Sequence, residues 1–332
     1  MKINIHNFTA IMSAILLFIN SLSAQDMHYS QQFSNPLYLN PAFAGIRECP
    51  NIGISYRNQW PNFSGGFSLA SIYYDQHINA IHGGLGAMVL ADVQGGGVYV
   101  NIKAGVTYSY RFKVGQKTYI RLAASAAYVN RRADWRNLTF ADQFDPQLGI
   151  VRQTEESMVN TLHNKHFADF AAGALFYGEN FYVGASVDHI GRPNEAFVGV
   201  QRMPIKVSIQ AGGVIYFTKT YNRKRSEDEM SLSPNILFTM QDKTEELSYG
   251  LYFTYRPIVI GAWLRHSFNN IDAVVGMIGF THNFIQIAYS YDATVSRLKG
   301  GGGAHEVSLL FKLPCKSAQK RGRITSVPCP SF

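Results

Sequence analysis

Residues that could do chemistry are few in this 332-residue chain, and they form no recognisable catalytic pattern. His163 and His166 have an i, i+3 spacing, but no cysteine or carboxylate nearby completes a metal site. Asp142 and Asp145 lie in the same polar stretch, at a spacing that is not that of an EF-hand calcium loop. The glycines at 300–303 precede no Gly-Lys-Ser/Thr, and no Gly-x-Ser-x-Gly occurs. The sequence therefore predicts a protein that is not an enzyme and has no cofactor or metal.

Composition narrows the class of protein. Hydrophobic residues make up 46% of the chain and aromatic residues 13%, whereas charged residues make up only 16%. Such a chain has enough apolar surface to fold, which excludes a disordered protein. Its one helix-like apolar run, Ile11–Ile19, is shorter than the ~20 residues that cross a bilayer as a helix. A mean hydropathy of −0.07 in a chain rich in Tyr, Phe and Gly is typical of a β-barrel of an outer membrane.

Residues 1–24 are predicted to be a secretory signal peptide. Lys2 precedes the apolar run, and the small residues of Ser21–Ala24 lead to a cleavage site before Gln25, although Leu22 is larger than the ideal residue at that position. An exported chain does not meet nucleic acid, despite its formal charge of +8. We therefore expect no nucleic-acid partner.

Alternation of polar and apolar residues is clearest from Val98 to Phe112. The even-numbered positions are apolar or aromatic, and the odd-numbered positions include Lys103 and Arg111. A run of this length exceeds the usual globular strand and suits a tilted strand that crosses a bilayer. We expect the apolar face to contact lipid and the polar face to line a wet lumen.

The same signals predict an all-β fold, a transmembrane antiparallel β-barrel of about 14 strands within residues 51–313. The expected strands are Ile52–Asn58, Phe67–Asp75, Gly84–Asp92, Val98–Phe112, Tyr119–Asn130, Phe167–Tyr177, Phe181–Ile190, Pro204–Phe217, Asn235–Gln241, Leu247–Tyr255, Ile258–Phe268, Asp272–His282, Phe284–Tyr291 and Ala304–Leu313. Short turns alternate with long loops, and if the long loops face outward both termini are periplasmic. A soluble β-sandwich is the alternative, but it fits poorly with such long strands and with aromatic residues near strand ends, such as Tyr110, Tyr252 and Tyr291.

Two segments do not fit the barrel pattern. In residues 25–50, two Asn-Pro pairs remove backbone donors and prevent a continuous strand, yet the neighbouring apolar residues require burial. This irregular segment is predicted to be either a plug of the lumen or a strip that binds a partner.

The tail, residues 314–332, is basic, and from Lys312 onward the chain has five basic residues and no acid. The tail either binds a periplasmic partner or is a solvated peptide. The candidate partner-binding residues are Asn35, Pro36, Leu37, Tyr38, Asn40, Pro41, Phe43, Gly45, Asp142, Gln143, Lys316, Lys320, Arg321 and Arg323.

The chain has three cysteines, and export permits disulfides. Cys315 and Cys329 are close enough in sequence for a disulfide that would stabilise the fold by about 3 kcal/mol in the chain-entropy model. The alternative is that Cys49, Cys315 and Cys329 are all unpaired.

The N-terminal block from Tyr29 to Gly45 resembles that of the PorP/SprF family of type IX secretion system outer-membrane proteins. Further similar blocks are Tyr56–Pro61, Leu138–Gln143, His189–Asn194, His305–Leu309 and Cys329–Phe332. The resemblance implies a barrel in the outer membrane of a Bacteroidota-type bacterium. It also implies partners, namely the periplasmic ring and the outer-membrane translocon of that system together with a secreted cargo protein.

The leading hypothesis for function is a non-enzymatic component of type IX secretion, involved in export or surface attachment of cargo such as gliding adhesins. In it the N-terminal block and tail bind partners, and the outer loops, chiefly Arg131–Lys165, hold cargo. One rival is an outer-membrane diffusion channel or transporter for small or hydrophobic solutes, since a lumen of fourteen strands is wide unless it is plugged. A surface hydrolase, the other rival, lacks a candidate triad.

Overall fold

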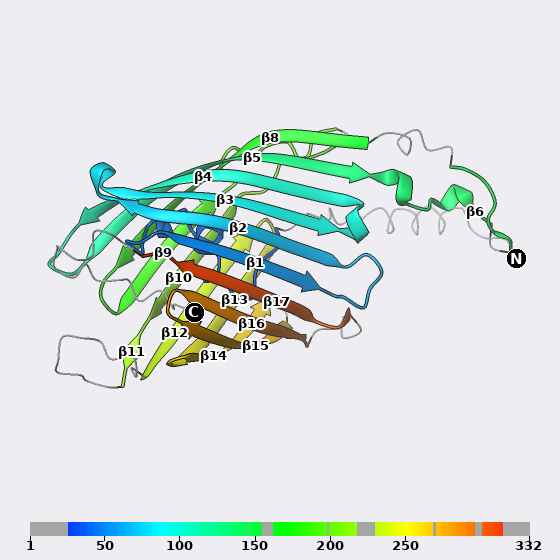
Figure 1. The fold of residues 1–332 in the computed structure, drawn as a ribbon. Helices are drawn as coiled ribbons and strands as arrows, with labels where there is room; N and C mark the ends of the chain where they lie inside the picture. The colour runs from blue at the N-terminus through cyan, green and yellow to red at the C-terminus, as the bar shows by residue number, and fades with distance from the viewer. Residues whose placement is uncertain are drawn as a thin grey trace, which may run out of the picture.

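The computed structural model describes residues 26–145, 147–154, 162–197, 199–217, 230–267, 270–295 and 301–314. Its main sheet is a closed barrel of fourteen antiparallel strands, in which the short β11 continues β10 (Figure 1). The strands are β1 (Asn51–Gln59), β2 (Phe67–Ile78), β3 (Gly83–Gln94), β4 (Tyr99–Lys113), β5 (Tyr119–Asp134), β8 (Leu162–Tyr177), β9 (Phe181–Asp188), β10 (Lys206–Gly213), β11 (Ile215–Tyr216), β12 (Met230–Gln241), β13 (Thr244–Tyr255), β14 (Ile258–Ser267), β15 (Asn270–His282), β16 (Ile285–Thr294) and β17 (Ala304–Lys312). The predicted barrel and its strand number are thus confirmed.

The barrel closes because its first and last strands pair. The register of β1 on β17 begins at Asn51↔Lys312, and β10 pairs with β12 on the far side. The ladder is interrupted between Gly212↔Asn235 and Ile215↔Leu232, and Pro234 lies in this interruption. Proline has no backbone N–H, so a gap in the ladder is where a strand tolerates it. Pro234 therefore does not end the strand, and β12 begins at Met230 rather than at the predicted Asn235.

Alternation along β4 places its two faces as expected. Ile102 and Val106 are exposed on the outside of the barrel, whereas Thr107 and Ser109 are buried on the inside. Tyr252 differs from its predicted position near the membrane interface. It is three residues from the exposed Tyr255, and the period of two therefore turns it into the lumen, where it is buried.

The predicted outer loop Arg131–Lys165 is partly strand. β5 continues to Asp134 and β8 begins at Leu162, so that Arg131 pairs with Lys165. The polar composition of these residues suggested a loop, but a hairpin that continues beyond the apolar band needs no apolar face. The remaining loop contains a small hairpin of β6 (Phe144–Asp145) and β7 (Gly149–Ile150).

The two ends of the barrel differ. At the turn end, residues 114–118, 178–180 and 256–257 connect strands by short turns and residues 217–229 form a longer connection, and the chain enters β1 and leaves β17. At the loop end, residues 135–161 and 189–205 form the longest connections. Among the described residues, no helix is long and apolar enough to cross a membrane.

The N-terminal segment, residues 26–46, passes lengthwise through the barrel. Asp26 contacts Gln241 and His189 at the loop end, whereas Gly45 contacts Asp75 near the turn end. Two short helices, α2 (Pro36–Leu39) and η1 (Pro41–Phe43), lie between these points. This path was not expected from the prediction that both termini are periplasmic, because Asp26 and the exit from β17 lie at opposite ends.

Candidate functional site

Two Asn-Pro pairs shape the middle of the N-terminal segment. The Asn35 side chain accepts a hydrogen bond from the Tyr38 N–H at 3.2 Å, and the Asn40 side chain accepts one from the Ala42 N–H at 2.8 Å. In each pair the following proline occupies the first helical turn, where a missing N–H leaves no bond unmade. The sequence therefore folds into two consecutive capped turns, and these place Phe43 and the other apolar side chains against the barrel wall.

The same two asparagines also attach the segment to the barrel. The Asn35 amide donates to Ser71 Oγ on β2 at 2.9 Å. The Asn40 amide donates to the carbonyls of Ala174 on β8 and Ala185 on β9, at 3.2 and 3.0 Å. Asn40 is 0% exposed. Its side-chain oxygen accepts and its amide nitrogen donates hydrogen bonds, so both polar atoms are satisfied. These asparagines thus fix both the shape of the segment and its position.

Gly45 permits a close approach at the turn end. Its φ is +63°, and a Cβ at this position would lie 2.6 Å from Gly84 Cα. Its N–H donates to Asp75 Oδ2 at 2.8 Å, and its carbonyl accepts from Arg121 Nη2 at 2.8 Å. Arg121 also donates to the carbonyl of Ala44. Only glycine fits this position, because a side chain would need both space and a left-handed backbone.

A buried cluster of charges holds the start of the segment. The Glu306 carboxylate on β17 accepts hydrogen bonds from the N–H groups of Ser30 and Gln31, at 2.7 and 3.1 Å. Arg57 on β1 forms ion pairs with Glu306 at 3.4 Å and with Asp292 on β16 at 3.0 Å. All three charged side chains are nearly inaccessible to solvent. Burial of charges at this depth is tolerated because each is paired and hydrogen-bonded.

Aromatic side chains from the barrel wall surround the segment. Phe33 packs against Tyr182, Tyr252 and Trp263, with ring centroids 6.0, 6.4 and 6.1 Å apart. Phe43 packs against Tyr182 at 5.9 Å and is fully buried. The main apolar core of the described residues is thus inside the barrel, between the segment and residues of β5, β8, β9, β12, β13, β14, β15 and β16.

At the loop end, Asp26 belongs to a chain of charged groups. His189 follows β9, and its Nε2 and Nδ1 lie 2.8 Å from Asp26 Oδ2 and 3.0 Å from Asp169 Oδ1. Lys103 Nζ lies 2.6 Å from the other oxygen of Asp169. Burial alone would lower the pKa of His189, but the two carboxylates raise it to about 9. Burial would raise the pKa of Asp26, but His189 and Lys206 hold it below its usual range.

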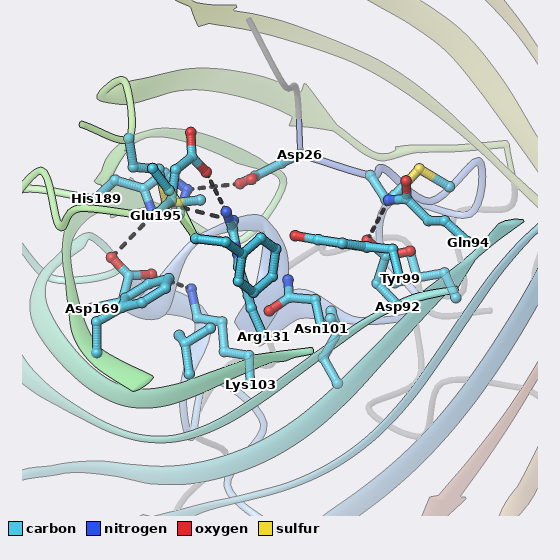
Figure 2. A pocket seen from close by; sticks show the side chains of 18 of the residues that line it. Asp26, Asp92, Gln94, Tyr99, Asn101, Lys103, Arg131, Asp169, His189 and Glu195 are labelled. Carbon is cyan, nitrogen blue, oxygen red and sulfur yellow. Dashed lines mark hydrogen bonds and ion pairs between the residues drawn. The ribbon is translucent and has the colours of Figure 1, made fainter. Parts of the chain in front are cut away.

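A cavity of about 580 Å³ lies beside this chain of charges. Figure 2 shows His189, Asp169 and Lys103 on one side of it and Asp92, Gln94 and Tyr99 on the other. Arg131 from β5 is paired with Glu195 from the loop after β9. Aromatic and aliphatic side chains also line it, among them Phe67, Leu69, Leu90, Val129, Trp135, Phe167 and Phe197. Ligand pockets commonly have this size and this mixture of side chains.

The predicted partner-binding residues separate into three places. Those from Asn35 to Gly45 lie inside the barrel, as described above. Asp142 and Gln143 lie in the loop between β5 and β8, where Asp142 accepts from Thr154 Oγ1 at 2.9 Å and Gln143 accepts from the Phe140 N–H at 2.8 Å. The structure does not bring these two groups together. The remaining candidates, Lys316, Lys320, Arg321, Arg323, Cys315 and Cys329, lie outside the described residues, as does the predicted signal peptide.

Several residues of the site were not among the predicted candidates. Arg57 and Glu306 fall in blocks that carry the family resemblance, and Arg121 and Asp169 lie on strands. Their sequence signal is a charged residue on the polar face of a transmembrane strand, but this signal does not reveal its partner. No cluster of metal-ligating side chains occurs among the described residues.

Comparisons with known proteins found solved structures with distant similarity and one matching family. Among solved structures, a Pseudomonas aeruginosa FadL homologue is 12% identical, with 82% of this chain and 92% of that chain covered and a TM-score of 0.42. A deletion mutant of the monoaromatic hydrocarbon channel TodX is 8% identical, with the same coverage and a TM-score of 0.42. A mutant of the Rh. blastica porin is 6% identical, with 80% of this chain and 99% of that chain covered and a TM-score of 0.33.

No curated protein matches the chain. A family model does match it, over residues 21–311, and thus spans both the N-terminal segment and nearly the whole barrel. The barrel and this match together indicate an outer-membrane protein, and the chain belongs to the type IX secretion system membrane protein PorP/SprF family.

Proposed function

We propose that this chain is a non-enzymatic outer-membrane component of type IX protein secretion, acting in the export or surface attachment of cargo. Membership of the PorP/SprF family supports a role in the type IX secretion system. The observation that favours a docking role over a conduit is the N-terminal segment, which is hydrogen-bonded to nine of the fourteen strands. Its polar contacts reach β1, β2, β4, β5, β8, β9, β12, β16 and β17.

In this proposal the loop end faces the cell exterior and the turn end faces the periplasm, because outer-membrane barrels have short periplasmic turns. The chain then leaves β17 on the periplasmic side, and the proposal assigns binding of the periplasmic ring and the other secretion components to the basic tail. The loops at 135–161 and 189–205 would contact cargo, such as adhesins used in gliding. The start of the described chain, Asp26, lies near the outer end of the lumen, so the proposal assigns the periplasmic contacts to the tail and the turns.

Deletion of the gene tests the proposal. We expect a defined subset of secreted or surface-attached proteins to be lost from the culture medium and the cell surface, and to return when the wild-type gene is restored. Quantitative proteomics of both fractions measures this. An unchanged secretome together with normal surface adhesins would rule the proposal out.

The cavity at the loop end favours a second candidate, a transporter for small solutes. In this case the N-terminal segment would be a movable hatch. Uptake of solutes by the deletion strain, rather than its secretome, would then change.

A further inference from the structure

We propose that the cavity at the loop end is a binding site for an organic cation, that is, an ammonium or guanidinium group on an apolar body. This inference goes beyond the proposed role in secretion and does not depend on it. It rests on the polar atoms that line the cavity without a partner, on the balance of charge and on the aromatic walls.

Asp92 on β3 is the main polar feature of this cavity. The residue is 6% exposed, and its Oδ2 accepts a hydrogen bond from Gln94 Nε2 at 2.8 Å. Its Oδ1 is buried and has no hydrogen-bond partner. Within the part of the chain that the structure describes, no basic side chain forms an ion pair with Asp92, as Figure 2 shows for the lining residues. A buried carboxylate in this condition is complementary to a bound cation.

The neighbouring strands supply further acceptors. Asp92 is directly opposite Asn101 on β4, and Asn101 is directly opposite Arg131 on β5. Asn101 Oδ1 and Glu195 Oε1 are also buried without a hydrogen-bond partner, and Arg131 Nε is the unpartnered donor of this group. A buried acceptor left without a donor is unfavourable. A ligand that brings several N–H groups and few acceptors satisfies this set, and ammonium and guanidinium groups do so.

The balance of charge also favours a cation. The other charged side chains that line the cavity are paired: Lys103 with Asp169, His189 with Asp26 and Asp169, and Arg131 with Glu195. Asp92 thus adds a negative charge that these pairs do not compensate. An anionic ligand would meet this carboxylate and find no uncommitted basic group among the described lining residues.

Aromatic side chains give the cavity walls that attract cations. Tyr99, Trp135, Phe167 and Phe197 line it, and the faces of such rings carry partial negative charge. The Arg131 guanidinium already lies over the Phe167 ring, 5.4 Å from its centroid. Leu90 and Val129 on the same wall suit an aliphatic or aromatic body attached to the cation.

The cation could come from a free amine or from an arginine or lysine side chain of a peptide. Calorimetry on the purified full-length protein in detergent would use agmatine for the first source and acetyl-Phe-Arg-amide for the second. Acetyl-Phe-citrulline-amide is the neutral control of nearly the same shape. We expect one or both cationic probes to bind, and the citrulline peptide to bind at least about tenfold more weakly than the arginine peptide.

Asp92→Asn removes the charge with little change of shape, and we expect it to weaken the cationic probes at least about tenfold. Asp242→Asn is the matched control. Asp242 is exposed in the turn between β12 and β13, and its φ of 54° suits asparagine. This variant should bind as the wild type does.

Tighter binding of the arginine peptide than of agmatine would identify a protein side chain as the source of the cation. Binding of agmatine at least as tight as that of the arginine peptide would identify a free amine. Equal binding of the citrulline peptide, unchanged affinity in Asp92→Asn or failure of both cations to bind would overturn the inference. Heat-dependent migration on gels checks that the variant barrel is folded. If Asp92→Asn does not fold, Asn101→Leu removes a neighbouring acceptor and must weaken the same probes.

Discussion

Among single residues, Glu306 contributes most directly to holding the N-terminal segment. It accepts from the Ser30 and Gln31 N–H groups and pairs with Arg57. Glu306→Ala removes one partner from a buried charge cluster and leaves two backbone donors unsatisfied. We expect the free energy of unfolding to fall by about 3–5 kcal/mol. Urea unfolding of the barrel in lipid vesicles measures this change.

Glu179 provides the control for this variant. Its carboxylate lies 2.8 Å from Lys117 Nζ at the turn end, and the Lys117 side chain is 68% exposed. Solvent screens such a pair, so Glu179→Ala should lower the unfolding free energy by at most about 1 kcal/mol. Equal effects of the two variants would show that the Glu306 cluster does not stabilise the barrel.

His189 gives the stability of the protein a dependence on pH. Its pKa is raised from 6.5 to about 9, because both ring nitrogens face carboxylates. Protonated His189 therefore stabilises the fold fully below pH 6.5, and this contribution is lost as the pH rises through 9. The stability difference between wild type and His189→Gln should fall by about 3 kcal/mol over this interval. Unfolding curves measured from pH 6 to pH 10 would contradict the pairing if the difference stayed constant.

The position of the N-terminal segment against the barrel wall depends on Gly45. Gly45→Ala would place a Cβ 2.6 Å from Gly84 Cα and 2.8 Å from the Gln76 carbonyl oxygen. Gly97 also has a positive φ, +97°, but a Cβ there would meet nothing within 4 Å. Gly97→Ala should therefore lower the unfolding free energy by the backbone strain alone, about 1–2 kcal/mol. Gly45→Ala should lower it by at least about 2 kcal/mol more, because backbone must shift.

The strands could be predicted from the sequence, whereas the contacts of the N-terminal segment could not. Alternation is a local signal, and it located each of the fourteen strands, including β4 with its two faces. The Asn-Pro pairs likewise predicted that residues 25–50 would be irregular. The bond from Ser30 to Glu306 joins residues 276 positions apart. No local pattern specifies such a partner, nor did the sequence distinguish a plug from an external strip.

The loop boundaries show a second limit of local patterns. Residues 131–134 and 162–165 are polar, and polarity favoured a loop, yet these residues pair as strand. A hairpin that continues from a barrel obtains its stability from the ladder already formed, which composition does not report. Tyr252 is the opposite case, since counting residues from Tyr255 would have placed it inside the barrel.

At the scale of the whole molecule, the N-terminal segment determines whether the barrel is a conduit. A barrel of fourteen strands encloses a wide lumen when it is empty. Here residues 26–46 occupy that lumen from the loop end to the turn end, and the cavity of about 580 Å³ lies beside Asp26 and Tyr38 of the segment. A docking role requires that the segment stay in place, whereas a hatch requires that it move.

Conductance in planar bilayers distinguishes these two possibilities. Wild-type protein should show little steady current, and deletion of residues 30–46 should raise single-channel conductance at least about tenfold, because the fourteen-stranded wall then encloses water. Should the deletion variant not insert, the pair Glu306→Ala and Gly45→Ala loosens the same segment and should increase the frequency of openings.

Ser34 and Ser55 provide the complementary test, since their hydroxyl oxygens lie 3.3 Å apart. A disulfide between cysteines at these two positions would fix the segment to β1, and export of cargo should continue. Loss of export on oxidation, restored by reduction, would show that the segment moves during secretion and would contradict a docking role.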